Sequence, residues 1–223
     1  MMLSGPRLEA KGKATHLVVL AHGYGADGND LIGLAPHWQQ AMPSVAFVAP
    51  NAPEPCAGSP MGYQWFPISR LDPHEMREGV ARAAPLFEEF LDAELARYGL
   101  PVERLALVGF SQGTMLSLHV GLRRKIAAIV GYSGLLADAP PALGPDAPPI
   151  LLVHGDSDPM IPADALFMSA GTLGAAGAAV QWHLSAGVGH SIDEDGLLLG
   201  AEFLSLALQG RLARTTPVIS SPL

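Results

Sequence analysis

Residues 105–113 read LALVGFSQG, and this stretch sets the architecture of the chain. Its first half, Leu105 to Gly109, is a short continuous apolar run, which is typical of a strand buried on both faces. Its second half places Ser111 between Gly109 and Gly113, in the pattern G-x-S-x-G. In this pattern a serine occupies a very tight turn between a strand and a helix, and the glycines remove side chains that would clash there. The stretch therefore predicts a strand, a turn that lifts a hydroxyl into solvent, and a helix.

The residues around this motif support the interpretation. Met115 to Leu122 reads as the helix that should follow the turn, whereas Ser133 lacks a glycine at the second required position. A glycine-rich turn with a passive serine would give the same letters, so the pattern alone does not establish chemistry. Ser111 is the candidate nucleophile.

Five further apolar runs have the length and composition of buried strands, and helical patterns alternate with them. The runs are 16–21 (HLVVLA), 45–49 (VAFVA), 126–131 (IAAIVG), 150–154 (ILLVH) and 180–184 (VQWHL). Alternation of this kind predicts one α/β domain over residues 1–223, with a mostly parallel central sheet and helices on both faces. A polar tail is expected from about Arg211. Sheets of this type bind ligands at the carboxyl ends of their strands.

Two helix starts carry capping signals. Asp72 precedes Pro73 and Glu75, which predicts an N-cap, a proline in the first turn and a helix that continues to Tyr98. Residues 191–194 (SIDE) form a second capping box, with Ser191 as the expected cap. A weaker, alanine- and glycine-rich helix is expected from 162 to about 177.

A serine hydroxyl needs a histidine to accept its proton and a carboxylate to orient that histidine. The turn 155–159 (GDSDP) follows a predicted strand and offers two aspartates. Asp158 lies further into the loop and can reach a histidine, whereas Asp156 is better placed to cap the turn. His190 follows the next strand, directly after the flexible glycines Gly187 and Gly189, and is the best-placed base. His22 and His154 end strands before glycine and are interpreted as structural hydrogen-bonding groups.

Negative charge that develops on a substrate carbonyl needs two backbone donors. The N–H of Gln112, directly after the candidate nucleophile, is one. The glycine-rich loop 21–28 (AHGYGADG) after the first long strand should supply the other. A phosphate-binding loop is the alternative, but this segment lacks both the G-x-G-x-x-G spacing and a P-loop lysine.

Composition excludes several classes of function. The chain has 13 Lys and Arg against 21 Asp and Glu, a formal net charge of −8, and its densest basic run is only residues 123–125. Nucleic-acid binding is therefore not expected. No uninterrupted apolar stretch reaches the length of a membrane span, and no residue pair has metal-ligand spacing. The one cysteine, Cys56, allows no intrachain disulfide. We expect a cytoplasmic protein without stable membrane insertion, cofactor or metal.

Four motifs, taken in order, resemble those of the phospholipase/carboxylesterase family of α/β-hydrolases. They are HGYGADGND (22–30), GFSQG (109–113), HGDSDPMIP (154–162) and GVGHS (187–191). The resemblance implies the α/β-hydrolase fold, with Ser111, Asp158 and His190 as the catalytic triad. It also implies that Tyr24 and Gln112 provide the oxyanion N–H groups and that homodimers form.

The expected substrate pocket rests on apolar residues near these motifs. By resemblance, Trp65 and Phe66 correspond to a pair beside the active site, and the apolar segments at Leu135 and Met160 are expected to wall an acyl pocket. Tyr24 and Pro67 depart from the usual residues of the family, and both departures bear on substrate choice. The predicted activity is hydrolysis of small carboxylic esters with short to medium acyl chains. An acyl-protein thioesterase, a lysophospholipase and a non-catalytic binding relative remain open alternatives.

Overall fold

The computed structural model describes residues 3–56, 58–59, 61–69 and 72–214. Beyond Arg214, the predicted polar tail lies outside these residues. A seven-stranded sheet in the order β1-β3-β2-β6-β7-β8-β9 forms the centre, and a two-stranded ribbon, β4-β5, stands apart from it. The strands are β1 (Arg7–Leu8), β2 (His16–Ala21), β3 (Val45–Val48), β4 (Glu54–Pro55), β5 (Tyr63–Gln64), β6 (Leu105–Phe110), β7 (Ala128–Tyr132), β8 (Ile150–Gly155) and β9 (Val180–Ser185).

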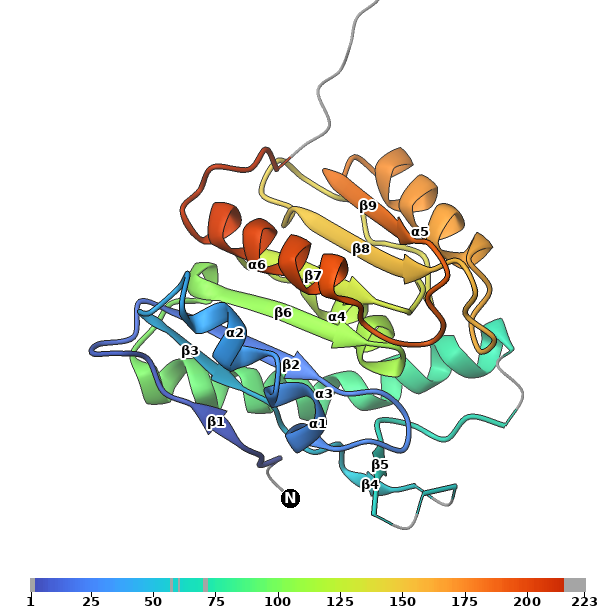
Figure 1. The fold of residues 1–223 in the computed structure, drawn as a ribbon, viewed down its shortest axis with the longest axis horizontal. Helices are drawn as coiled ribbons and strands as arrows, with labels where there is room; N and C mark the ends of the chain where they lie inside the picture. The colour runs from blue at the N-terminus through green and yellow to red at the C-terminus, as the bar shows by residue number, and fades with distance from the viewer. Residues whose placement is uncertain (1–2, 57, 60, 70–71, 215–223) are drawn as a thin grey trace, which may run out of the picture.

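Every pairing in the large sheet is parallel except that of β1 with β3. Helices cover both faces of this sheet (Figure 1), which confirms the predicted fold class. The helices are α1 (Gly28–Ile32), α2 (Ala35–Gln39), α3 (Pro73–Tyr98), α4 (Gln112–Gly121), α5 (Asp164–Ala175) and α6 (Glu194–Leu208), with a 3-10 turn at Val102–Arg104.

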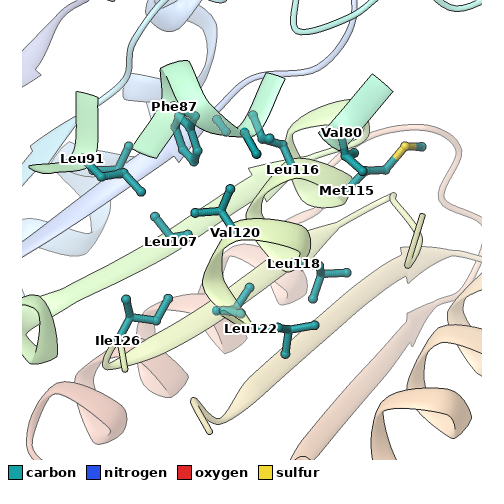
Figure 2. Packing of buried hydrophobic residues seen from close by; sticks show 14 of the residues in the cluster. Val80, Phe87, Leu91, Leu107, Met115, Leu116, Leu118, Val120, Leu122 and Ile126 are labelled. Atoms are coloured by element: carbon teal, nitrogen blue, oxygen red, sulfur yellow. The ribbon is translucent and has the colours of Figure 1, made fainter. Parts of the chain in front are cut away.

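The core has two layers because alternate residues of each central strand face opposite sides of the sheet. On β6, Leu105 and Leu107 belong to the layer under α3, α4 and α5, whereas Ala106 and Val108 belong to the layer under α1, α2 and α6. Figure 2 shows the first layer, where Phe87 of α3 lies above Leu107 of β6 and Val120 of α4. Burial on both faces explains why these strands are apolar without alternation.

Helix ends follow local capping chemistry. Asp72 accepts hydrogen bonds from the N–H groups of His74 and Glu75, and Gly99 ends α3 in the left-handed region at φ 64°. These ends are confirmed as predicted. The start of α6 was misplaced at the sequence level: Asp193, rather than Ser191, caps the helix by accepting from the N–H of Gly196.

Two other expectations need correction. Strand β9 is an edge strand, and Gln181 and Trp182 are exposed on it, so it is not buried on both faces. The two-residue strands β1, β4 and β5 were not predicted, because they are too short to carry a pattern of alternation.

Candidate active site

Ser111 occupies a strained turn at the carboxyl end of β6. Its backbone angles are φ 54° and ψ −115°, and its N–H donates to the carbonyl of Tyr132 at 2.8 Å. A Cβ on Gly109 would overlap the backbone of Gly113, and one on Gly113 would overlap the carbonyl of Ala21. The steric reason predicted for both glycines is therefore confirmed. A non-glycine residue in such a region costs about 1–3 kcal/mol, and outliers of this kind are concentrated at functional sites.

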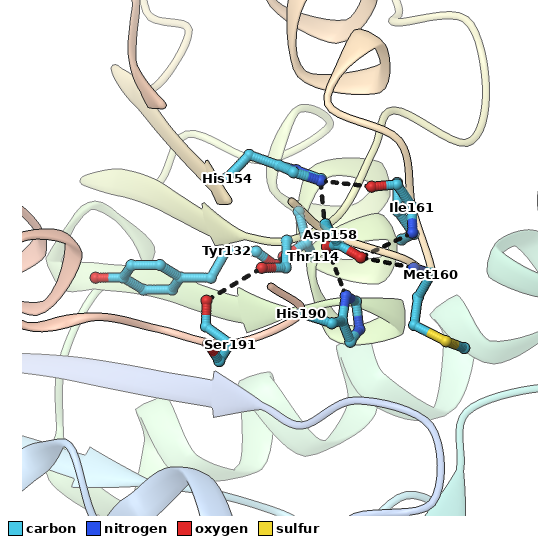
Figure 3. Close-up of polar contacts among 9 residues, drawn as sticks. Thr114, Tyr132, His154, Asp158, Met160, Ile161, His190 and Ser191 are labelled. Carbon is cyan, nitrogen blue, oxygen red and sulfur yellow. Dashed lines mark hydrogen bonds and ion pairs between the residues drawn. The ribbon is translucent and has the colours of Figure 1, made fainter. Parts of the chain in front are cut away.

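Asp158 and His190 form a hydrogen-bonded pair. Asp158 follows β8, His190 follows β9, and Nδ1 of His190 lies 2.7 Å from Oδ2 of Asp158 (Figure 3). The other oxygen of Asp158, Oδ1, accepts the N–H groups of Met160 at 2.8 Å and Ile161 at 3.0 Å. Because the carboxylate engages Nδ1, Nε2 is the ring nitrogen left to exchange protons with a substrate.

The environment of Asp158 keeps it ionised. Burial acts to raise the pKa of the carboxyl group, but the hydrogen bonds from Ile161, His190 and Met160 outweigh that effect and hold the pKa below its ordinary value. A group with this balance stays negatively charged at neutral pH and can stabilise a positive charge on His190.

His154 touches the same carboxylate from the end of β8. Its Nε2 lies 2.9 Å from the carbonyl oxygen of Ile161 and 3.3 Å from Oδ2 of Asp158. The side chains of His154 and Asp158 are both fully buried. Two oxygens that only accept hydrogen bonds face this nitrogen, so Nε2 carries the proton. His154 thus holds the carbonyl of the residue whose N–H holds Asp158. The predicted structural role of His154 is confirmed, and its contact with Asp158 is additional.

The loops that carry Asp158 and His190 are joined by hydrogen bonds. Oδ1 of Asp156 accepts the N–H of Gly187 at 2.7 Å and the hydroxyl of Ser157 at 2.8 Å. Asp156 therefore links the loop after β8 to the loop that leads to His190, whereas the sequence had predicted that it caps its own turn.

Ser111 and His190 line one cavity of about 500 Å³. Its other lining residues are Tyr24, Ile68, Ser69, Met115, Met160 and Ile161. Within the described residues, no hydrogen bond joins Ser111 to His190, whose ring packs at 4.9 Å from that of Phe110. Catalytic hydrogen bonds are often long before substrate binds, so facing one cavity is the relevant geometry.

Of the two residues expected to supply oxyanion N–H groups, Tyr24 lines this cavity and Gln112 directly follows Ser111, which also lines it. The N–H of Gln112 belongs to the first turn of α4, where amides have no partner within the helix. Its side chain is anchored, since Oε1 accepts the N–H of Trp65 at 2.8 Å and Nε2 donates to the carbonyl of Phe66 at 2.7 Å. Tyr24 stands at the cavity wall, and a hydrogen bond between its hydroxyl and Cys56 raises the pKa of Tyr24.

Three of the expected pocket residues lie elsewhere. Trp65 and Phe66 are 2% and 0% exposed and belong to the core; the indole N–H of Trp65 donates to the carbonyl of His22. Leu135 lines a separate cavity of about 610 Å³ between α3 and α5. Met160 does line the cavity of Ser111, together with Met115, which sequence reasoning missed although it lies one helical turn after Ser111.

The described residues contain neither a metal-binding cluster nor a membrane-spanning helix. No three histidine, cysteine or acidic side chains in this part of the chain are close enough to hold a metal ion. None of its helices combines the length and apolarity needed to cross a bilayer.

The pattern of the family described as Phospholipase/Carboxylesterase matches residues 8–208. The chain belongs to this family. It is similar to acyl-protein thioesterase 1 of Gibberella zeae, with 31% identity over 203 residues, 82% of this chain and 86% of that protein. It is also similar to the esterase YpfH of Escherichia coli, with 28% identity over 198 residues, 86% of this chain and 82% of that protein.

Among solved structures, the crystal structure of esterase PE8 has 41% sequence identity and a TM-score of 0.86, and the match covers 92% of this chain and 98% of that chain. The architecture is the α/β-hydrolase fold that the four motifs predicted.

Proposed function

We propose that this member of the phospholipase/carboxylesterase family is a serine hydrolase that cleaves small carboxylic esters with short to medium acyl chains. The observation that carries the proposal is the Asp158–His190 pair beside the cavity that also contains the strained Ser111. Family membership and similarity to an esterase and to an acyl-protein thioesterase support it.

In the proposed first step, Nε2 of His190 takes the proton of the Ser111 hydroxyl while Oγ bonds to the carbonyl carbon. The carbonyl electron pair moves to the oxygen, and the N–H groups of Gln112 and Tyr24 stabilise this oxyanion. When the tetrahedral intermediate collapses, the bond to the alcohol breaks and the alcohol leaves with the proton from His190.

The second half repeats this chemistry with water. His190 takes a proton from water, the hydroxide oxygen bonds to the acyl carbon, and Ser111 leaves as the protonated hydroxyl. The net reaction of the two halves converts the ester and water into a carboxylic acid and an alcohol. Asp158 stays ionised throughout and stabilises the imidazolium that forms in each half.

A thioester substrate is the second candidate, because the relative from Gibberella zeae is an acyl-protein thioesterase. The same residues would act, with a thiol as leaving group. A cytoplasmic location is part of the proposal, because a chain with one cysteine forms no intrachain disulfide, as is usual in reducing compartments.

The test is hydrolysis of p-nitrophenyl esters and matching thioesters over a series of acyl lengths. Ser111→Ala should lower kcat by roughly 10⁴-fold or more and abolish labelling by a fluorophosphonate probe. Ser133→Ala is the matched control, because Ser133 also has a positive φ, 45°, at the end of the neighbouring strand but does not line the cavity. Retained turnover in Ser111→Ala would overturn the proposal.

A further inference from the structure

A second cleft lies on the other side of His190. Its volume is about 300 Å³, and His190 is the residue that it shares with the cavity of Ser111. The cleft is lined by Asp30, Leu31, Leu34, Phe110, His190, Ser191 and Ile192. Its walls therefore come from α1 and the start of α2, from the end of β6 and from the loop before α6. None of these residues except His190 has a role in the proposed reaction.

The chemistry at His190 indicates which part of a substrate this cleft receives. A tetrahedral carbon bonded to Ser111 carries an oxyanion, an acyl substituent and a leaving group. The leaving group takes its proton from the imidazole, so it must lie against His190. The apolar side chains of Met115 and Ile161 line the first cavity, which also contains Ser111, and suit an acyl chain. The cleft beyond His190 is then left for the alcohol or thiol.

The lining of the cleft favours a positively charged ligand group. Asp30 is exposed at its edge and is the acidic side chain among the described lining residues, which include no lysine or arginine. The aromatic ring of Phe110 and the aliphatic walls of Leu34 and Ile192 complete the lining. An aromatic face, alkyl groups and a nearby carboxylate together suit a substituted ammonium group, which is positively charged but weakly hydrated.

We propose that this cleft binds the leaving group of the substrate and favours alcohols or thiols that carry a positive charge. The inference rests on the proposed hydrolase activity and specifies its substrate class.

The experiment compares two thioesters with the same acetyl group. Acetylthiocholine carries a trimethylammonium group, and 3,3-dimethylbutyl thioacetate has the same shape without the charge. The released thiol is followed with a thiol-reactive dye. Asp30→Asn should lower the ratio of kcat/KM for the cationic ester to kcat/KM for the neutral ester by about 3-fold to 10-fold. This range follows from Coulomb attraction between the carboxylate and the ammonium group at about 6 Å, with an effective dielectric constant of about 80 to 40. The effect should shrink as salt is added.

Glu89→Gln is the matched control. It makes the same change in net charge from an exposed position on α3, which covers the opposite face of the sheet from α1. An unchanged ratio in Asp30→Asn, or an equal change in Glu89→Gln, overturns the charge preference.

Placement in the cleft is tested separately with Leu34→Trp. The indole should obstruct the cleft and lower kcat/KM for 3,3-dimethylbutyl thioacetate while sparing S-methyl thioacetate, whose leaving group is too small to enter. If Leu34→Trp instead impairs methyl thioesters of long acyl chains, the cleft holds the acyl group and the inference is wrong. Failure of the hydrolase proposal looks different, because then no thioester is cleaved in a Ser111-dependent way.

Discussion

The contact between His154 and the candidate acid leads to a sharp prediction. His154 donates from Nε2 to the carbonyl of Ile161, and the same nitrogen lies 3.3 Å from Oδ2 of Asp158. Nδ1 of His154 is buried and has no hydrogen-bond partner among the described residues. The side chain therefore works through one nitrogen only. His154→Leu removes that donor, whereas His154→Gln can place an amide N–H at nearly the same point.

The structure sets the size of the effect. Without the donor, the carbonyl of Ile161 stays buried without its partner, which costs about 1–3 kcal/mol of stability. For a chain of this size, that loss lowers Tm by about 3 to 10 °C. Ile161 also donates to Oδ1 of Asp158, so movement of its peptide displaces the carboxylate. A misplacement of about 1 Å costs on the order of 10²-fold in rate. We expect kcat/KM of His154→Leu to fall about 10-fold to 100-fold, less than the roughly 10⁴-fold expected when the acid is lost.

The assay is kcat/KM for p-nitrophenyl acetate, with active enzyme counted by fluorophosphonate titration so that loss of folded protein does not count as loss of activity. His154→Gln should recover kcat/KM to within about 3-fold of the wild type. If folded His154→Leu has wild-type kcat/KM, or if the Gln and Leu variants are equally impaired, His154 does not position Asp158. A downfield proton signal from the Asp158–His190 hydrogen bond should shift in the Leu variant and be restored in the Gln variant.

Three further predictions concern the stability of the fold and of the strained turn at Ser111. Burial acts to raise the pKa of Asp138, but hydrogen bonds and charge from His119 and Arg123 outweigh burial and lower the pKa in the folded state. Ionised Asp138 therefore stabilises the fold above about pH 4, and this stabilisation is lost as pH falls through the folded-state pKa. In thermal unfolding, Asp138→Asn should lower Tm at pH 7 and leave it unchanged at pH 2. Gly113→Ala should lose more than about 3 kcal/mol in urea unfolding, because its methyl group meets main chain that cannot rotate away; a near-native midpoint would contradict this. Gln112→Leu leaves two buried peptide groups without partners and should lower the free energy of unfolding, measured in urea, by about 2–4 kcal/mol; an unchanged free energy of unfolding would contradict this.

The sequence predicted the sheet well because each central strand is buried on both faces. Such strands are uninterrupted apolar runs, and β2, β6 and β8 begin at the predicted residues. Parallel strands place their carboxyl ends at one edge, so motifs that follow β6, β8 and β9 were expected to meet there. The pairing of Phe110 with Tyr132 and of Gly155 with Ser185 brings these ends into line.

The pocket was harder to predict because an apolar residue gives the same signal in a core and in a cavity wall. Trp65 and Phe66 carry large apolar side chains, yet their backbone groups bind Gln112 and their side chains turn into the layer under α3. The segment therefore holds the side chain of Gln112, the residue after Ser111, in place. The direction of its side chains depends on tertiary packing that the sequence does not encode locally.

The strained turn at Ser111, here called the elbow, is stabilised by hydrogen bonds to the neighbouring strand. The carbonyl of Tyr132 accepts both the N–H of Ser111 at 2.8 Å and the hydroxyl of Thr114 at 2.9 Å, so one acceptor on β7 holds the start and the first turn of the helix that follows β6. Ser133, the residue directly after that strand, also has a positive φ, and its own N–H donates to the carbonyl of Val153 on β8. Backbone hydrogen bonds thus connect Ser111 to β7 and Ser133 to β8, the strand that leads to Asp158. A site made this way needs the sheet to be complete before the candidate nucleophile is correctly placed, and variants that loosen β7 should lose activity before they lose the fold.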